Sequence, residues 1–196
     1  IHHRVKNNLQ VISSLLDLQA MNLNDETALS ALNEGQNRVK SIALIHQQLY
    51  QNDDFASIEV NRFVSDLYKQ VSIVFLKPGQ EVNFENNIST TFLDIDTAVP
   101  LGLMLNELFT NAFKYAFISS AAGKLIVDFK ETEKGNYEMN ISDNGPGLPA
   151  DFDFKKAKSM GLRLVRRLAK QVHGGVEYRT EAGGVFAIRF RDGVGG

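Results

Sequence analysis

Apolar residues recur at helical spacing through the first fifty positions of the chain. Between residues 5 and 23 they fall three or four apart, which predicts one buried stripe along a helix, formed by Val5, Leu9, Ile12, Leu15, Leu16 and Leu23. A second helical pattern covers residues 25–50, with Asn24 or Asp25 as its candidate N-cap. The short connection Asn22-Leu23-Asn24-Asp25 predicts that the two helices form an antiparallel hairpin.

Helical projection separates the two histidines that begin this hairpin. At about 100° per residue, His2 falls on the apolar stripe, whereas His3 falls on the polar side, in line with Asn7. The alternative that both histidines are structural or solvated stays open at this point. His46 lies beside the stripe of the second helix, and we interpret it as a packing or hydrogen-bonding residue rather than a catalytic one.

The pattern changes after residue 54 to a mixture of helices and strands. Helices are predicted over 60–76, 97–117 and 161–174, the second with Pro100 near its first turn and the third closed by Gly174 and Gly175. Strands are predicted over 81–89 and 91–96, on both sides of a turn at 134–136, and in a terminal hairpin over 175–190. We therefore predict an α+β protein, with the helical hairpin in residues 1–54 and an α/β sandwich in residues 55–196 whose helices cover one sheet face.

Composition narrows the class of protein. The 196 residues are 43% hydrophobic and 22% charged, with a net charge of −2, which is typical of a soluble globular protein and gives no reason to expect nucleic-acid binding. The absence of cysteine excludes disulfides, thiolate metal sites and a cysteine nucleophile. No signal peptide or run long enough to span a membrane is visible, so we expect a cytoplasmic protein without direct membrane insertion. The chain begins inside a predicted helix, as a fragment of a longer protein would.

Three stretches in the second domain carry candidate chemistry. In "NELFTNAFKYAF", Glu107 and Asn111 share a helix face, with Lys114 and Tyr115 a turn further on; an amide can bind magnesium and a lysine can neutralise phosphate. The alternative is an ordinary amphipathic helix.

The second stretch, "SDNGPGL", follows an apolar strand. Its two glycines, Gly145 and Gly147, allow a tight turn around a ligand, and Asp143 could accept a hydrogen bond from an exocyclic amine. The alternative is a plain surface turn. The third stretch, "KSMGLRLV", begins a helix at Gly161, where free amides can bind a phosphate, or where a loop simply meets a helix. Residues 149–159 before it lack periodicity and would suit a mobile lid.

Taken in order, these stretches resemble the asparagine and glycine motifs of the Bergerat ATP-binding fold. With "HHRVKNNLQ" and "RVKSIALIHQQLY" in front, the chain is similar to the sensor histidine kinases of the second HisKA-type group, relatives of the HWE kinases, from His2 to about Phe190. The resemblance implies that His3, in a His-Arg-x-x-Asn motif with Asn7, is the phosphoacceptor. This agrees with the outward projection of His3.

The resemblance also implies the ligands and partners. ATP would place its adenine amine on Asp143, with Gly145 and Gly147 beside the base. Asn111 would hold Mg²⁺ on the phosphates, next to Lys114 and Tyr115, while the lid and helix start, Ser159, Gly161 and Leu162, would contact the phosphates. His3 would attack the γ-phosphorus and pass the phosphoryl group to an aspartate of a response-regulator receiver domain. A homodimer through the hairpin is expected, and a sensor domain upstream is absent from this chain.

Some positions depart from the family pattern. Arg4 follows His3 where the larger kinase group has an acidic residue, so the proton would go elsewhere, for example to Glu107. Ser159 replaces a glycine of the second glycine motif, and Ala187 stands where relatives often carry a threonine near the adenine. Two other functions stay open: an ATPase in which Glu107 activates water, and a degenerate module that only binds partners.

Overall fold

The computed structural model divides into two compact units, Ile1–Phe55 and Ala56–Gly196. It describes residues 2–21, 25, 26, 28, 29, 32, 35, 36, 38, 39, 42, 43, 57–89, 91–118, 122–149, 152–157 and 159–192; the side chains of residues 2–6 and 155 are outside this set. Within the described residues, no helix is both long and apolar enough to cross a membrane.

The first unit contains helix α1 (His2–Ala20) and further helical residues between 26 and 43. The Asp25 carboxylate accepts a hydrogen bond from the Ala28 amide at 3.1 Å, which makes Asp25 the N-cap of the second helical segment. Asp17 of α1 accepts a hydrogen bond from the side chain of Gln36. Because the connection at residues 22–25 lies between Asp17 and Gln36 in the sequence, this contact brings the second helical segment back against α1, as a helical hairpin requires. His46 lies outside the described residues.

The predicted single buried stripe on α1 is wrong in part. Leu9 and Leu16 are half-buried, but Ile12 and Leu15 are 44% and 56% exposed. Val11 and Leu18 are exposed as well, at 58% and 56%. The helix therefore carries apolar residues on two sides, and the second helical segment covers only one of them.

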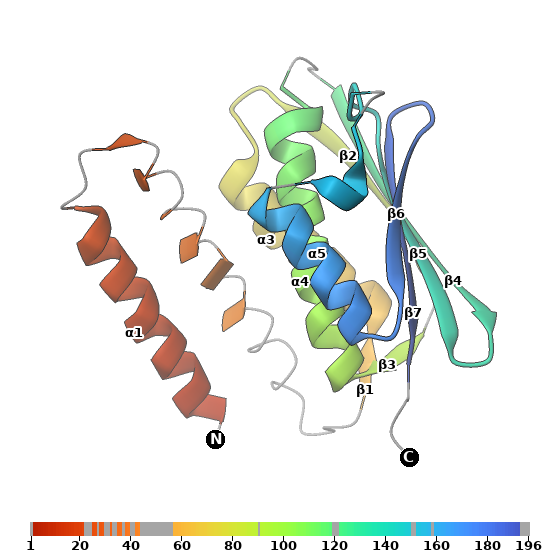
Figure 1. Cartoon of the computed structure of the whole chain (residues 1–196), viewed down its shortest axis with the longest axis horizontal. Coiled ribbons are helices and arrows are strands. Elements are labelled where there is room, and N and C mark those ends of the chain that lie inside the picture. The colour runs from red at the N-terminus through yellow and green to blue at the C-terminus, as the bar shows by residue number, and fades with distance from the viewer. Residues whose placement is uncertain are drawn as a thin grey trace. The chain divides into compact units, whose positions relative to one another are not determined.

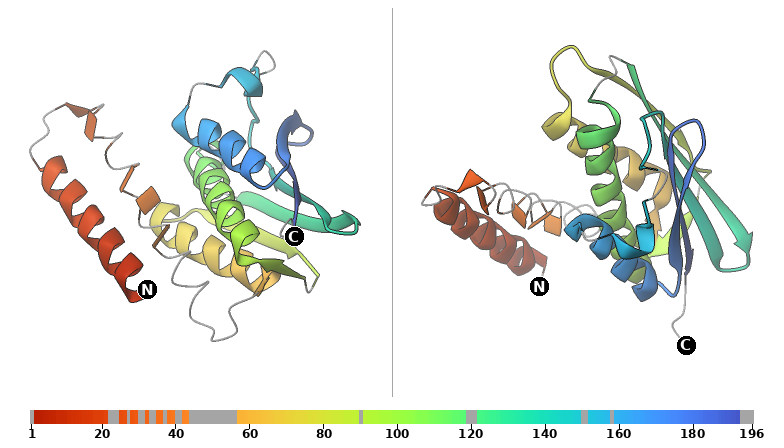
Figure 2. Two further views of the ribbon diagram at one scale, coloured as in Figure 1. Left: turned by 60° about the horizontal axis from the view of Figure 1, so that its bottom comes forward. Right: turned by 45° about the horizontal axis from the view of Figure 1, so that its top comes forward.

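The second unit is a five-stranded sheet with helices on one face (Figure 1). The strands are β2 (Glu81–Asn87), β4 (Ala122–Glu133), β5 (Asn136–Asp143), β6 (Gly175–Thr180) and β7 (Gly184–Arg191), in the order β2-β4-β5-β7-β6. Only β2 and β4 are parallel; the other pairs are antiparallel. Helices α3 (Val60–Phe75), α4 (Ile95–Asn111) and α5 (Met160–Gln171) cover the sheet, and the views of Figure 2 keep all three on the same side.

Helix α4 lies at the centre of this unit because its sequence is apolar on almost every side. It packs against both α3 and α5 as well as the sheet, so one apolar stripe would not suffice. The Phe109 ring lies edge-on to Phe84 of β2, with ring centres 6.1 Å apart. The fully buried side chains of α4 include Leu101, Met104, Leu105 and Phe109.

Two boundaries around α4 differ from the prediction. The helix begins at Ile95, two residues before the predicted start, so Pro100 lies in the second turn rather than the first. Strand β3 (Phe92–Asp94) does not join β2; it pairs with β1 (Ser57–Glu59), a strand that the sequence pattern did not indicate. The two predicted neighbours therefore belong to different sheets, because β2 instead pairs in parallel with β4 across the α4 crossover.

The end of α5 also corrects the sequence analysis. The residue in the left-handed conformation is His173 (φ 52°), and neither Gly174 nor Gly175 has a positive φ. The Gly174 amide donates to the Ala169 carbonyl at 2.9 Å. A Cβ on Gly174 would lie 1.8 Å from the Arg189 carbonyl oxygen of β7. Glycine is required at 174 by this close approach to the sheet, not by the turn itself.

On the sheet face away from the helices, Glu138 is held by two cations. Its carboxylate accepts from Arg189 Nε at 2.9 Å and from Lys130 Nζ at 3.1 Å, and its side chain is only 12% exposed. The bond from Arg189, followed by that from Lys130, lowers the pKa of Glu138 to about 2. Because these bonds join β4, β5 and β7, Glu138 stabilises the middle of the sheet.

We predict that Glu138→Gln lowers the free energy of unfolding by about 1 kcal/mol at pH 7. The folded pKa of Glu138 lies below the unfolded value of 4.5, so its contribution is present above that value and is lost as the pH falls towards 2. Urea unfolding at pH 7, 5 and 3 should show the difference between wild type and variant narrowing. Glu133→Gln, an exposed residue on β4, is the control; a difference that stays constant with pH would contradict the assignment.

Candidate functional site

Asp143, the last residue of β5, is the centre of the candidate site. Its Oδ1 accepts hydrogen bonds from the Gly145 amide at 2.9 Å and the Gly184 amide at 3.4 Å. Burial raises the pKa of Asp143, while the bonds from Gly145 and Gly184 oppose that rise. No described residue donates to Oδ2 of this carboxylate. One oxygen is therefore fixed by the backbone, and the other can accept a hydrogen bond from a ligand.

The glycine loop, residues 144–148, follows Asp143 and is fastened to β4. The Asn144 side chain accepts from the Lys124 amide at 2.7 Å and donates to the Ala122 carbonyl at 3.3 Å. A Cβ on Gly145 would lie 2.5 Å from the Cβ of Ala116, so the loop reaches the end of the preceding helix only because residue 145 is glycine. Gly147 has φ +70°, the left-handed conformation that favours glycine.

The end of α4 brings the asparagine motif to this loop. Glu107 is 6% exposed and Asn111 is half-buried, and the helix continues from Ala112 to Ala116 as a π-helical turn closed by the Phe117 amide on the Ala112 carbonyl. Since Ala116 contacts Gly145, the structure brings the end of the first motif against the second. Single π turns of this kind occur frequently at functional sites.

The π turn changes the positions that the sequence spacing predicted for Lys114 and Tyr115. Lys114 is half-buried, with its Nζ 5.7 Å from the centre of the Phe75 ring, and Tyr115 is 63% exposed. Neither residue therefore continues the face of Glu107 and Asn111 at regular α-helical spacing. Their contact with phosphates remains a prediction.

The third motif forms the start of α5. Ser159 is exposed and is the N-cap by its backbone, without a side-chain cap bond; its carbonyl accepts from the Arg163 amide at 3.1 Å. Gly161 and Leu162 are buried where α5 packs on α4. The first amides of a helix have no intrahelical acceptor, so this helix start can bind an anion.

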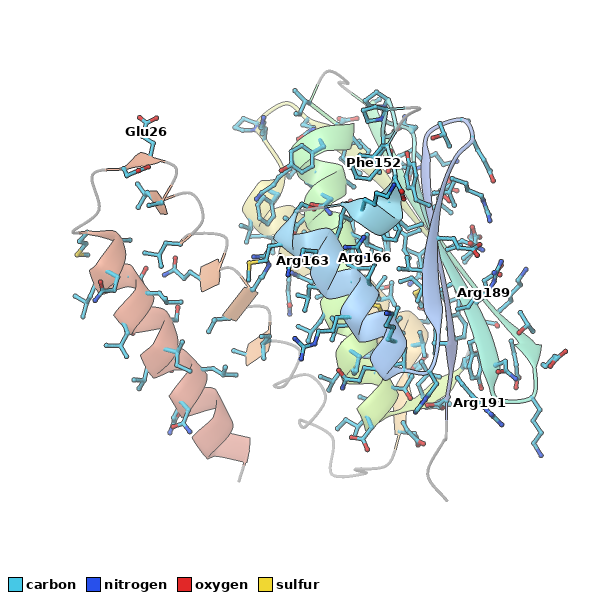
Figure 3. All side chains as sticks on the ribbon, in the orientation of Figure 1. Glu26, Phe152, Arg163, Arg166, Arg189 and Arg191 are labelled. Carbon is cyan, nitrogen blue, oxygen red and sulfur yellow. The ribbon has the colours of Figure 1, made fainter. Side chains whose placement is uncertain are left out.

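The segment before α5, predicted as a lid without regular structure, contains a 3₁₀ turn, η2 (Phe154–Lys156). Arg166 of α5 donates to the carbonyls of Phe154 and Ala157 at 2.5 and 3.0 Å. Figure 3 labels Arg166 on α5 and Phe152 at the start of this segment. The Phe154 ring is buried and lies edge-on to Phe186 of β7 at 5.7 Å. The described part of the lid, residues 152–157, is therefore anchored to both α5 and the sheet.

Sequence reasoning misplaced one residue of the site and missed two others. Ala187 pairs with Asn140 and shares its sheet face with Arg189 and Glu138, opposite to Asp143, so it does not lie near the expected adenine position. Gly184 and Tyr178 lie beside Asp143 and the glycine loop instead. The adjacent glycines 183 and 184 were the available signal, because such pairs in a hairpin often mark close approach of another backbone.

In the first unit, His3 lies in α1, but its side chain is outside the described residues. Asn7, one turn further on, is exposed. The structure therefore places both residues on a helix and leaves their roles as predictions.

The layered sheet, the Asp143 loop and the glycine-led α5 together define a class of ATP-binding domain. A family described as histidine kinase-, DNA gyrase B- and HSP90-like ATPases matches residues 96–193, which implies that the second unit binds ATP. A second family, described as histidine kinase (HisKA_2), matches residues 1–75. The chain belongs to the histidine kinase family.

The relatives agree with this membership. Sensor histidine kinase PdtaS of Mycolicibacterium smegmatis is 33% identical over 169 residues, which is 86% of this chain and 33% of that protein. Blue-light-activated histidine kinase 2 of Erythrobacter litoralis is 24% identical over 196 residues, covering 96% of this chain and 54% of that protein. The chain thus spans between a third and about half the length of these curated relatives.

Solved structures share the fold. The histidine kinase domain of the Erythrobacter litoralis EL346 blue-light-activated kinase superposes with a TM-score of 0.68 at 23% identity, over 97% of this chain and 88% of that one. The catalytic domain of histidine kinase ThkA gives a TM-score of 0.57 at 17% identity, over 69% of this chain and 95% of that one. The predicted α+β class, with N-terminal helices and a mixed-sheet ATP-binding domain, is confirmed.

We predict that Asp143→Asn raises the stability of the ligand-free protein at pH 7. Because the folded pKa of Asp143 is raised, its ionised form costs stability at neutral pH, and this cost disappears as the pH falls through the raised pKa. The neutral amide keeps an acceptor for the Gly145 and Gly184 amides without burying a charge. Urea unfolding at pH 7 measures the change.

Asp128→Asn on β4 is the control, because Asp128 is exposed and, among the described residues, bonds only to Asn87, at 2.9 Å. It should change stability little. A loss of stability in Asp143→Asn larger than in Asp128→Asn would show that the charge of Asp143 supports the fold.

Proposed function

We propose that the chain is the core of a sensor histidine kinase that phosphorylates its own His3 from ATP. The observation that carries this proposal is the Asp143 carboxylate, with Oδ1 fixed by two backbone amides and Oδ2 without a donor among the described residues. Such an oxygen suits the exocyclic amine of adenine, and Gly145 and Gly147 allow the base to approach the backbone.

Asn111 fits the role of the protein ligand for Mg²⁺. The described residues contain no cluster of three or more His, Asp or Glu that could hold a metal by itself. Magnesium, however, commonly takes one or two protein oxygens and completes its shell with substrate phosphates and water. The half-buried Asn111 amide forms no hydrogen bond with a described residue, so its oxygen is available. Bound Mg²⁺ would neutralise charge on the phosphates.

The phosphates would lie between the end of α4 and the start of α5. Gly161 and Leu162 would contribute free backbone amides, with Ser159 beside them. Lys114 would supply positive charge and the exposed Tyr115 a hydroxyl. The anchored lid would exclude water from this end of the nucleotide.

In the chemical step, a ring nitrogen of His3 forms a bond to the γ-phosphorus while the bond from that phosphorus to the bridging oxygen breaks and ADP leaves. An imidazole with the ordinary pKa of about 6.5 is mostly neutral, and therefore nucleophilic, at pH 7.5. Asn7 would orient the ring and Glu107 would accept its proton. The phosphoryl group then passes from His3 to an aspartate oxygen of a response-regulator receiver domain.

Two alternative functions do not phosphorylate His3. In an ATPase of the same fold, Glu107 would activate water; the helical hairpin that carries His3, which such an ATPase would not need, argues against this function. In a degenerate module the hairpin would bind partners without chemistry. Asp143 Oδ2 and the Asn111 amide, neither of which bonds to a described residue, argue against loss of the nucleotide site.

The exposed apolar side of α1 supports a homodimer through the hairpin. Val11, Leu15 and Leu18 lie at positions i, i+4 and i+7 and are each 56–58% exposed in the single chain. Such a stripe is typical of the seam of a four-helix bundle, which two copies of a helical hairpin form.

We predict that γ-labelled ATP with Mg²⁺ transfers acid-labile, alkali-stable label to the wild-type chain. His3→Gln should abolish the label because it removes the nucleophile. Asn111→Ala should reduce it at least ten-fold because it removes the proposed protein ligand of magnesium.

His46→Gln is the matched control and should keep the label. Label that survives in His3→Gln would contradict the assignment of His3 and transfer it to another histidine. Release of free phosphate without label on the protein would instead support the ATPase.

We predict that Leu15→Asp converts the dimer into a monomer, because a carboxylate in an apolar seam loses its hydration without gaining a partner. Light scattering after size exclusion measures the mass. Gln10→Asp is the control and should stay dimeric, because Gln10 is exposed and at about 100° per residue lies roughly 140° around the helix from Leu15. A wild-type monomer at micromolar concentration would refute the proposed dimer.

A further inference from the structure

Tyr178 of β6 lies against the glycine loop at its most constrained point. Its hydroxyl oxygen accepts a hydrogen bond from the Leu148 amide at 2.7 Å, and Thr180 Oγ1 lies 3.4 Å from the same oxygen. A Cβ on Gly147 would lie 3.0 Å from this hydroxyl. The phenol therefore contacts the backbone of two successive loop residues, and it does so from a strand that is 30 residues away in the sequence.

The same hydroxyl lies close to the candidate acceptor, Asp143. A Cβ on Gly184 would be 2.9 Å from Asp143 Oδ2 and 3.3 Å from Tyr178 Oη, so both oxygens border the same small space above Gly184. Any side chain at 184 would push one of the two groups away. The absence of a side chain at 184 thus permits Tyr178 to reach the loop, while Asp143 Oδ2 accepts from no residue in the part of the chain that the structure describes.

The ring of Tyr178 is held in place by a neighbouring aromatic ring of β7. It pairs across the strands with Phe186, with ring centres 4.9 Å apart, and Phe186 in turn contacts the Phe154 ring of the lid. Because the ring packs against Phe186, its hydroxyl is held in one position. A row of three aromatic rings therefore connects the lid, β7 and β6 to the glycine loop.

We propose that Tyr178 is a positioning residue for the nucleotide site, whose hydroxyl holds Gly147 and Leu148 in the conformation that receives the base. This inference rests on the proposed nucleotide binding. Tyr178 acts through the loop and not on the reacting atoms. Residues 145 and 147 can adopt many backbone conformations because they are glycines, so a specific bond to the loop lowers the entropic cost of ordering it on binding.

The test compares Tyr178→Phe with Tyr137→Phe. Tyr137 also packs between two phenylalanines of the sheet, but its hydroxyl forms no hydrogen bond with a described residue. Tyr178→Phe should weaken ATP binding, measured by titration calorimetry with Mg²⁺, about five-fold or more, the loss expected for one hydrogen bond. It should also speed amide hydrogen exchange at Leu148, while exchange in α4 and the melting temperature stay near wild type. Tyr137→Phe should leave affinity and exchange at Leu148 unchanged.

A second variant, Gly184→Ala, tests the same geometry from the other side. Its Cβ would displace Asp143 Oδ2 or Tyr178, so affinity should fall further than in Tyr178→Phe. If wild type binds ATP and Tyr178→Phe binds equally well with unchanged exchange at Leu148, Tyr178 is not a positioning residue. If wild type itself binds no ATP, the proposed function fails, and exchange at Leu148 still reports whether the hydroxyl holds the loop. Equal exchange in that case would overturn the inference independently.

Discussion

The candidate site of the second unit depends on one carboxyl group held by two backbone amides. The amides of Gly145 and Gly184 converge on Oδ1 of Asp143 from segments that lie 39 positions apart in the sequence. For the two amides to converge, backbone segments must approach more closely than any side chain would allow. A Cβ on Gly183 would lie 1.8 Å from the Asp143 carbonyl oxygen, and one on Gly145 would overlap Ala116. The loop, the end of α4 and the β6–β7 hairpin therefore meet at one point because glycines occupy it.

That arrangement stabilises the site at some cost to the fold. Burial disfavours the Asp143 charge, and the two backbone bonds compensate only in part, since the pKa of this carboxyl stays raised. Functional sites commonly carry such a cost, because a fully satisfied carboxylate would have no acceptor left for a ligand. Glu138, in the same strand, shows the contrast. Two cations satisfy both of its carboxylate oxygens, and its pKa falls to about 2.

The sequence predicted the parts of this fold that depend on local pattern. Strict alternation gave β4 and β5 with the turn between them, and apolar periodicity gave α3, α4 and α5. Local pattern could not predict that β2 pairs in parallel with β4 while β3 pairs with β1, because both choices are made by contacts across the chain. The π turn after Asn111 and the left-handed conformation of His173 were not predicted for the same reason: each depends on the residues that pack against it.

In the candidate site, too, the residues that are close in sequence were predicted, and those brought in by strand register were not. The motif at the end of β5 pointed to Asp143, Gly145 and Gly147, which are neighbours in sequence. The family resemblance put Ala187 near the adenine, but its register places it on the sheet face opposite to Asp143. Tyr178 carries no motif, and its role follows only from the pairing of β6 with β7 and the bend of the loop toward it. A residue that acts on a ligand through another segment can be found from the sequence of that segment. Here Gly147 and Gly184 indicate Tyr178, because their missing side chains make room for the phenol. In a fold built on close backbone approach, the glycines therefore indicate where to look for the side chains that position the site.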